Sequence, residues 1–287
     1  IPIIGFFSSW AHGTHPGLWW FQAADYRFYG TMHAEGQALN CGMLFLAAAT
    51  MRENGDRLTR RLFLGVMLVA AIFLVLTKAR GPFIATIIAF GVFSLCTKKR
   101  STLVAYSFSV IVVLGVLFLV FGDALLPSLS SGMNLGRQET SGGMTGRIDL
   151  WRHLSGFVAE RPVLGYGLGG FWTVDRTLAI AEFHQWRAGE SHSIYVDTAL
   201  DLGLIGLGIF LILVIVAWLR TWRICVNGGD EGGAFAAGLL TLWMIDGLAA
   251  SVVLGRGFIT LLLLIVLFSI SVESQLQRSR PEVRNDP

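Results

Sequence analysis

Two arginines stand at short interruptions of strongly apolar sequence. Arg80 precedes Gly81 and Pro82, and Arg256 lies between two glycines. Proline is favoured in the first turn of a helix, so Arg80 is expected beside a helix N-terminus, whose free N–H groups and dipole also attract anions. Phosphate or pyrophosphate is the expected ligand. Arginines at helix ends also reach toward lipid headgroups. The anion site is favoured for Arg80, and the headgroup contact is favoured for Arg256.

A third arginine, Arg147, begins an amphipathic stretch between Gly146 and Val158. One helical face of this stretch carries Arg147, Trp151, Leu154 and Val158. The planar guanidinium could clamp a ligand anion, or the helix could lie on a membrane surface with its arginine at the edge, and the spacing leaves both open. The glycine-rich run that follows, 162–171, lacks the strand–turn–helix setting of a nucleotide site, so we reject nucleotide binding there.

His192 is expected at the start of an apolar helix, with Ser191 or Ser193 as its N-cap. A helix N-terminus disfavours the charged imidazolium. The ring would then be able to accept a proton from a hydroxyl group. A lone histidine at such an interface is more often structural than catalytic.

Carboxylates also occur within apolar sequence. Asp197 and Asp201 share a helical face, and Asp246 lies deep in another apolar run. Such residues usually face the interior of a helix bundle, where they form an ion path or pair structurally. We favour structural pairing. His12 and His15 have loose metal-ligand spacing but no third ligand in view, so no metal site is expected.

The elements that position these residues are predicted to be membrane-spanning helices. Of the 287 residues, 54% are hydrophobic and 14% are charged, and the mean hydropathy is +0.62. That is more apolar surface than a soluble domain buries. A span needs roughly 20 apolar residues and must be helical. The sequence predicts a single all-α membrane domain, 1–287, with spans at about 34–51, 62–77, 81–96, 102–121, 192–219, 233–254 and 257–272.

Basic residues give the orientation of these spans. Arginine and lysine clusters follow the first, third, fifth and seventh predicted spans, which parity places on one side. Positive loops stay in the cytoplasm, so the large loop at about 122–191, with its short amphipathic helices, is expected outside. Glu35 and Gln37, which begin the first predicted span, could line the same external cavity. The net charge of +3 is dispersed over these clusters, so nucleic acid is a poor partner.

The segment 192–206 resembles the hallmark of the O-antigen ligase and polymerase superfamily. In this pattern a histidine and a serine, asparagine or glutamine are followed by nine residues, glycine, two residues and glycine, which fits His192, Ser193, Gly203 and Gly206. The Arg80–Pro82 turn, the 147–171 loop and the segment 26–37 are similar to further parts of the family. Ile84 stands where the ligase pattern has leucine. Family members usually carry more N-terminal spans, so we expect that an N-terminal portion precedes Ile1.

The resemblance implies a metal-independent, cofactor-free glycosyltransferase on the periplasmic face of the bacterial inner membrane. The donor would be an undecaprenyl-diphosphate-linked glycan and the acceptor a sugar hydroxyl of lipid A-core. Arg80 and Arg147, and more weakly Arg256, would hold the diphosphate, and His192 would activate or orient the acceptor. Two alternatives stay open. One is an O-antigen or exopolysaccharide polymerase of the same superfamily, whose acceptor is a second lipid-linked glycan. The other is a transporter, which should show internal repeats, and the sequence shows none. The oligomeric state is not indicated.

Overall fold

The computed structural model describes residues 34–77, 79–97, 144–184, 189–226 and 231–250, and every regular element in these ranges is an α-helix. Two predicted spans, 102–121 and 257–272, lie outside the described residues. The same holds for Arg256, His12 and His15. Of the predicted external loop, residues 144–184 and 189–191 are described.

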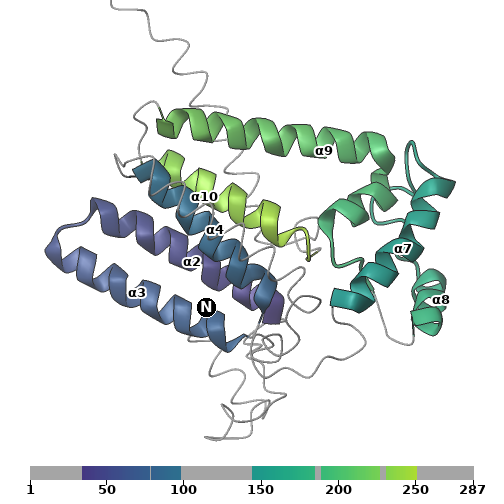
Figure 1. Cartoon of the computed structure of the whole chain (residues 1–287), viewed down its shortest axis with the longest axis horizontal. Coiled ribbons are helices and arrows are strands. Elements are labelled where there is room, and N and C mark those ends of the chain that lie inside the picture. The colour runs from purple at the N-terminus through teal and green to yellow at the C-terminus, as the bar shows by residue number, and fades with distance from the viewer. Residues whose placement is uncertain (1–33, 78, 98–143, 185–188, 227–230, 251–287) are drawn as a thin grey trace, which may run out of the picture.

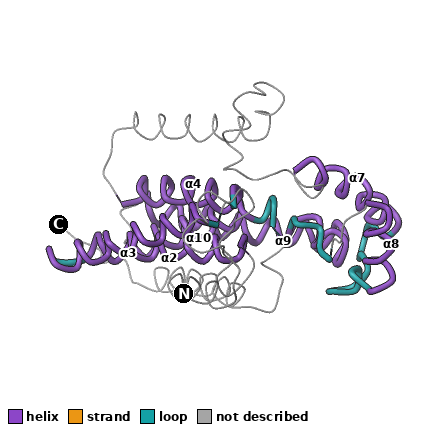
Figure 2. Tube along the Cα trace, turned by 90° about the horizontal axis from the view of Figure 1, so that it is seen from below, coloured by secondary structure: helices purple, strands orange, loops and turns teal. Residues whose placement is uncertain are grey.

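Five helices lie side by side and form a bundle, shown in Figure 1. They are α2 (Ala34–Asn54), α3 (Arg57–Leu76), α4 (Arg80–Thr97), α9 (Ile194–Val226) and α10 (Glu231–Asp246). Helix α10 packs against α4, α9 and α2, and α3 packs against α2. Two further helices, α7 (Met144–Glu160) and α8 (Val174–His184), lie together at one end of the bundle in both views (Figures 1 and 2).

The core of the bundle lies where α2, α4 and α10 meet, and it is rich in small residues. A Cβ added at Gly42 would collide with the Thr86 hydroxyl, and one at Gly238 would lie 3.2 Å from the Ala89 carbonyl oxygen. Small residues let helix backbones approach closely, which is a common way to associate helices in lipid. Leu39, Leu46, Leu239 and Leu240 fill the remaining space and are fully buried.

Among the residues that the structure describes, three helices are long and apolar enough to cross a membrane, namely α3, α4 and α9, and α10 is a shorter apolar helix. Helix α3 and the second half of α9 leave many large apolar side chains exposed, among them Leu68, Ile72, Ile212 and Leu213. Such continuous apolar faces on long helices are suited to lipid contact. The described part of the chain is therefore an all-helical membrane protein.

Helix α9 occupies the region of the fifth predicted span, at about 192–219, but it is not continuous. Helix α9 begins two residues later, at Ile194, and it is broken at Gly203, where φ is 67°. A Cβ at Gly203 would collide with the carbonyl of Val163. The sequence gives no polar signal of this break, because the residues that follow Gly203 are continuously apolar.

The glycine-rich run 162–171 hydrogen-bonds the backbone groups that the break leaves without helical partners. Tyr166 N donates to Leu200 O (2.9 Å), Gly167 N donates to Asp201 O (2.8 Å), and Leu204 N donates to Pro162 O (2.7 Å). Unpaired backbone groups at such a position would cost several kcal/mol in an apolar environment, on the order of 2 to 7 each. The glycine-rich run 162–171 and the break at Gly203 thus form one joint between the outer loop and α9.

Helix α10 also differs from the sixth predicted span, 233–254, because it ends at Asp246. The chain then turns: Leu248 N donates to Ile245 O (3.2 Å) and Ala249 N donates to Asp246 O (2.9 Å). These tighter bonds close the last turn of the helix and redirect the backbone. We call residues 247–250 the α10 turn.

Candidate functional site

The α10 turn is the meeting point of three segments that lie far apart in the sequence. Ile194 N, at the start of α9, lies 3.0 Å from both Gly247 O and Ala250 O. Arg147 Nη1, from α7, donates to Ala249 O at 3.0 Å. At the start of α4, a Cβ added at Gly81 would lie 3.8 Å from Asp246 Oδ1 and 3.9 Å from Ala249. The structure therefore brings the neighbours of Arg80 and His192 together with Arg147.

Arg147 is mostly buried and held by two elements besides its own. Its Nη2 lies 2.8 Å from Glu35 Oε1 in the first turn of α2, with 14% of the arginine side chain and 17% of the glutamate side chain exposed. Its Nε is buried and has no hydrogen-bond partner within the described ranges. The guanidinium thus has a fixed orientation, and further N–H groups on its two terminal nitrogens could receive an anion.

The predicted apolar face of the Arg147 helix is confirmed. Leu154 is fully buried, and Val158 packs against the same cluster, which we call the outer cluster; its fully buried members are Leu150, Leu154, Phe171, Ile180 and Leu200. Trp151, on the same face, donates from its indole nitrogen to Ser191 O at 2.8 Å. This bond links the Arg147 helix directly to the residue before His192.

His192 lies in a strained backbone conformation just outside α9. Its φ of 57° makes it the one non-glycine residue with positive φ in the part of the chain that the structure describes. Such conformations persist where the surroundings enforce them, and they are frequent at functional sites. The His192 Nδ1 atom lies 3.2 Å from Glu190 Oε1, and about a fifth of the side chain is exposed.

The two serines beside His192 hold this conformation. Ser191 Oγ donates to Ser193 O (2.8 Å) and accepts from Ser193 N (3.1 Å). Ser193 O in turn accepts from Asp197 N at 3.0 Å, so Ser193 occupies the N-cap position of α9. The expected capping serine is present, but His192 precedes the helix instead of beginning it.

Arg80 lies where the sequence predicted, at the first residue of α4, with Pro82 in the first turn. Ala79 N donates to Thr77 Oγ1 at 3.3 Å, and Phe83 N donates to Ala79 O at 3.3 Å, which defines the start of the helix. The Arg80 side chain is partly buried. Its helix N-terminus faces the α10 turn through Gly81.

The carboxylates on α9 bind the outer loop. Asp197 Oδ1 accepts from the Trp172 indole nitrogen (2.9 Å) and from Ser191 N (3.1 Å), and Asp201 Oδ2 accepts from Gly169 N (2.9 Å). These contacts favour the structural reading of both residues. Asp246 is buried and interacts electrostatically with Glu35 and Arg147. Its Oδ1 has no hydrogen-bond partner in the described part of the chain.

Sequence reasoning missed two parts of this arrangement. The first is the Glu35–Arg147 ion pair, whose members lie 112 residues apart, so that only the presence of a charge at the start of an apolar helix hinted at it. The second is the α10 turn, which acts through its backbone carbonyl groups and carries no distinctive side chain. Arg256, the weakest of the predicted diphosphate ligands, lies outside the described residues.

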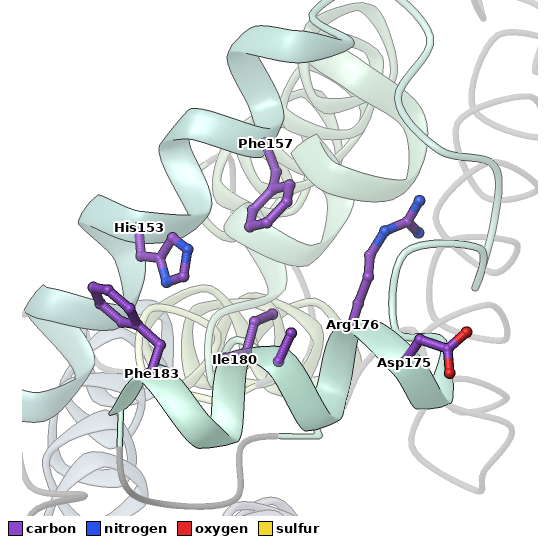
Figure 3. A pocket seen from close by; sticks show the side chains of 7 residues that line it. His153, Phe157, Asp175, Arg176, Ile180 and Phe183 are labelled. Atoms are coloured by element: carbon purple, nitrogen blue, oxygen red, sulfur yellow. The ribbon is translucent and has the colours of Figure 1, made fainter.

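A separate cavity of about 500 Å³ lies between α7 and α8 (Figure 3). Its walls are His153 and Phe157 from α7 and Asp175, Arg176, Ala179, Ile180 and Phe183 from α8. Arg80, Arg147 and His192, the predicted site residues that the structure describes, do not line it. Within the described ranges, no group of three metal-ligating side chains is close enough to hold a metal ion.

The helices and this cluster define a class of protein, a helical membrane protein with a buried arginine and a strained histidine gathered at one end of its bundle. The sequence profile described as O-antigen ligase matches residues 65–211, about half of the chain, and the chain belongs to this family. The match contains Arg80, Arg147 and His192, whereas Glu35 and Asp246 lie outside it. No curated protein matches the sequence.

Proposed function

We propose that this protein transfers a glycan from undecaprenyl diphosphate to a sugar hydroxyl of lipid A-core at the periplasmic face of the bacterial inner membrane. The observation that carries the proposal is the convergence of Arg147, the start of α4 and the His192 segment on the α10 turn. A diphosphate leaving group needs cations beside a hydroxyl-activating base, and this end of the bundle gathers both kinds of group.

In the proposed reaction, the acceptor oxygen attacks the anomeric carbon of the donor glycan. The bond between that carbon and the phosphate oxygen breaks, and the bonding electron pair leaves with undecaprenyl diphosphate. His192 accepts the proton of the acceptor hydroxyl. Arg80, Arg147 and the N-terminus of α4 stabilise the charge on the departing diphosphate. Because these fixed groups neutralise the leaving group, we propose that the reaction needs no metal ion.

The distribution of basic residues supports the proposed side of the membrane. The α2–α3 turn and the C-terminal ends of α4 and α9 lie at one end of the bundle, and the α7–α8 pair lies at the other (Figure 1). Arg52, Arg57, Arg60, Arg61, Arg220 and Arg223 all belong to the first of these ends. Positive residues favour the cytoplasm, so α7 and α8 would face the periplasm.

A polymerase of the same family differs only in its acceptor, a second lipid-linked glycan. Lipopolysaccharide from a strain that lacks the protein separates the two functions. Loss of the whole ladder with lipid-linked polymer still present supports the ligase, and a single repeat unit on the core supports the polymerase. The hydrogen bonds of Asp197 and Asp201 to the outer loop give no support to an ion path, so we do not propose transport.

The decisive experiment uses purified full-length protein, undecaprenyl-diphosphate-linked glycan and lipid A-core, with a chelator present. Transfer is expected for the wild type and should be lost in the His192→Ala, Arg80→Ala and Arg147→Ala variants, all of which should accumulate in the membrane. Arg152→Ala is the matched control, because Arg152 lies on the same helix as Arg147 but is 76% exposed and pairs with neighbouring Asp149. Near-normal transfer by the His192 variant would contradict its assigned role.

A further inference from the structure

We propose that Glu35 is a positioning residue for the reaction, holding the guanidinium of Arg147 in the orientation that receives the donor diphosphate. This inference rests on the proposed function and extends it to a residue outside the region matched by the family profile. Glu35 lies in the first turn of α2, 112 residues before Arg147 in the sequence. Its Oε1 atom lies 2.8 Å from Arg147 Nη2.

The burial of the pair sets it apart from an ordinary surface ion pair. With 14% and 17% of the side chains exposed, solvent screens the interaction only partly. The comparison within α7 is direct: Arg152 pairs with Asp149 at 3.0 Å, but those side chains are 76% and 57% exposed. A buried, charge-assisted hydrogen bond fixes geometry, whereas the exposed pair leaves both side chains free to change rotamer.

The remaining contacts of Arg147 show why one carboxylate decides its orientation. Nη1 is held by Ala249 O, and Nε has no hydrogen-bond partner among the residues that the structure describes. Within the described part of the chain, two contacts from two separate elements therefore fix the plane of the guanidinium, and loss of the Glu35 contact leaves a single one. A guanidinium that pivots about one bond cannot present its planar fork to a phosphate in a constant geometry.

The hydrogen bond, more than the negative charge, is the positioning element. The buried carboxyl of Asp246 already lies close enough to act electrostatically on both Glu35 and Arg147. A second negative charge gives no benefit to binding of an anionic diphosphate. An amide in place of the Glu35 carboxylate keeps an acceptor oxygen for Nη2 and should therefore keep the orientation of Arg147.

The test measures equilibrium binding of undecaprenyl diphosphate, together with the KM for the lipid-linked donor and for lipid A-core, on purified full-length variants. For Glu35→Ala we expect donor affinity to fall by about tenfold or more, the scale on which misplacement of a positioned group acts. The acceptor KM should be unchanged. The donor affinity of Glu35→Gln should stay within about threefold of the wild-type value. Asp149→Ala, which breaks the exposed pair on the same helix as Arg147, should have the same donor affinity as the wild type.

The outcomes separate this inference from the proposed function. If Arg147→Ala loses undecaprenyl diphosphate binding while Glu35→Ala keeps it, Arg147 is a ligand but Glu35 does not position it. Tighter donor binding by both Glu35 variants would make the carboxylate a competitor of the diphosphate, which also overturns the inference. If Arg147→Ala keeps full diphosphate binding, the role of Arg147 in the proposed function fails, and positioning by Glu35 fails with it.

Discussion

At the scale of single residues, α7 and α8 are joined by a pair of imidazole rings, those of His153 and His184. His153 Nδ1 and His184 Nε2 lie 3.0 Å apart, which requires that one ring be a neutral acceptor. Burial, together with the nearby charge of His153, lowers the pKa of His184 below its usual value; Asp149 acts in the opposite direction. The contact between α7 and α8 is therefore sensitive to pH.

We expect the protein to lose stability as the pH falls below the ordinary histidine pKa of about 6.5. Because the folded-state pKa of His184 is lowered, the unfolded chain binds its proton first, and stability is fully present only above that pH. The measurement is the thermal unfolding temperature of purified protein between pH 8 and pH 5. A His184→Gln variant should show a shallower dependence; an equal slope in variant and wild type would exclude His184 as the cause.

Asp197 gives a second prediction at this scale. Its Oδ1 accepts from Trp172 and from Ser191 N, and both donors belong to the segments around His192 and the outer cluster. Asp197→Ala leaves these donors unsatisfied and should cost about 1 to 3 kcal/mol for each donor that stays buried. Transfer activity should fall as well, because Ser191 helps to hold His192. Asp197→Asn retains an acceptor oxygen and should lie between the alanine variant and the wild type in thermal unfolding and in activity.

At the scale of elements, the joint between the glycine-rich run and α9 should be intolerant of side chains. Gly203→Ala places a Cβ against the Val163 carbonyl and requires a positive φ, so we expect a loss of about 1 to 3 kcal/mol or more. Gly208→Ala is the matched control, five residues further along α9, where a Cβ meets no atom of the described residues within 4 Å. Alanine there should leave stability unchanged or raise it slightly. Equal unfolding temperatures for the two variants would contradict the assigned role of the joint.

The comparison of sequence and structure also belongs to this scale. Hydropathy located α2, α3, α4 and the body of α9 within a few residues, because lipid leaves the helix as the only conformation for such segments. The break at Gly203 escaped prediction, since its partners lie in a distant loop. The partners of Arg147 and Asp197 could not be predicted either, because they also lie in distant parts of the sequence. Local pattern identified Arg147 and His192 as candidates, and only the packing of α2, α7, α9 and α10 shows what holds them.

At the scale of the whole molecule, the proposed orientation can be tested by chemical labelling. Val174, at the start of α8, is 75% exposed, and Leu58, near the start of α3, is 73% exposed at the opposite end of the bundle. In a full-length protein with its native cysteines replaced, Val174→Cys should react with a membrane-impermeant maleimide in intact spheroplasts. Leu58→Cys should react only after permeabilisation. The reverse pattern would place α7 and α8 in the cytoplasm and contradict the proposed site of transfer.

The α10 turn has a consequence for how this chain can vary. It receives Ile194 and Arg147 through the carbonyl oxygens of Gly247, Ala249 and Ala250, which every amino acid possesses. Ala249, which is partly exposed, should therefore accept other side chains more readily than the buried Ala250 or than Gly247, where a Cβ would lie 2.6 Å from Ile194. Insertion or deletion of a single residue should be tolerated less well than a substitution, because it would shift all of these carbonyl oxygens at once. Related chains should thus differ here in residue type while keeping the number of residues between Asp246 and Ala250.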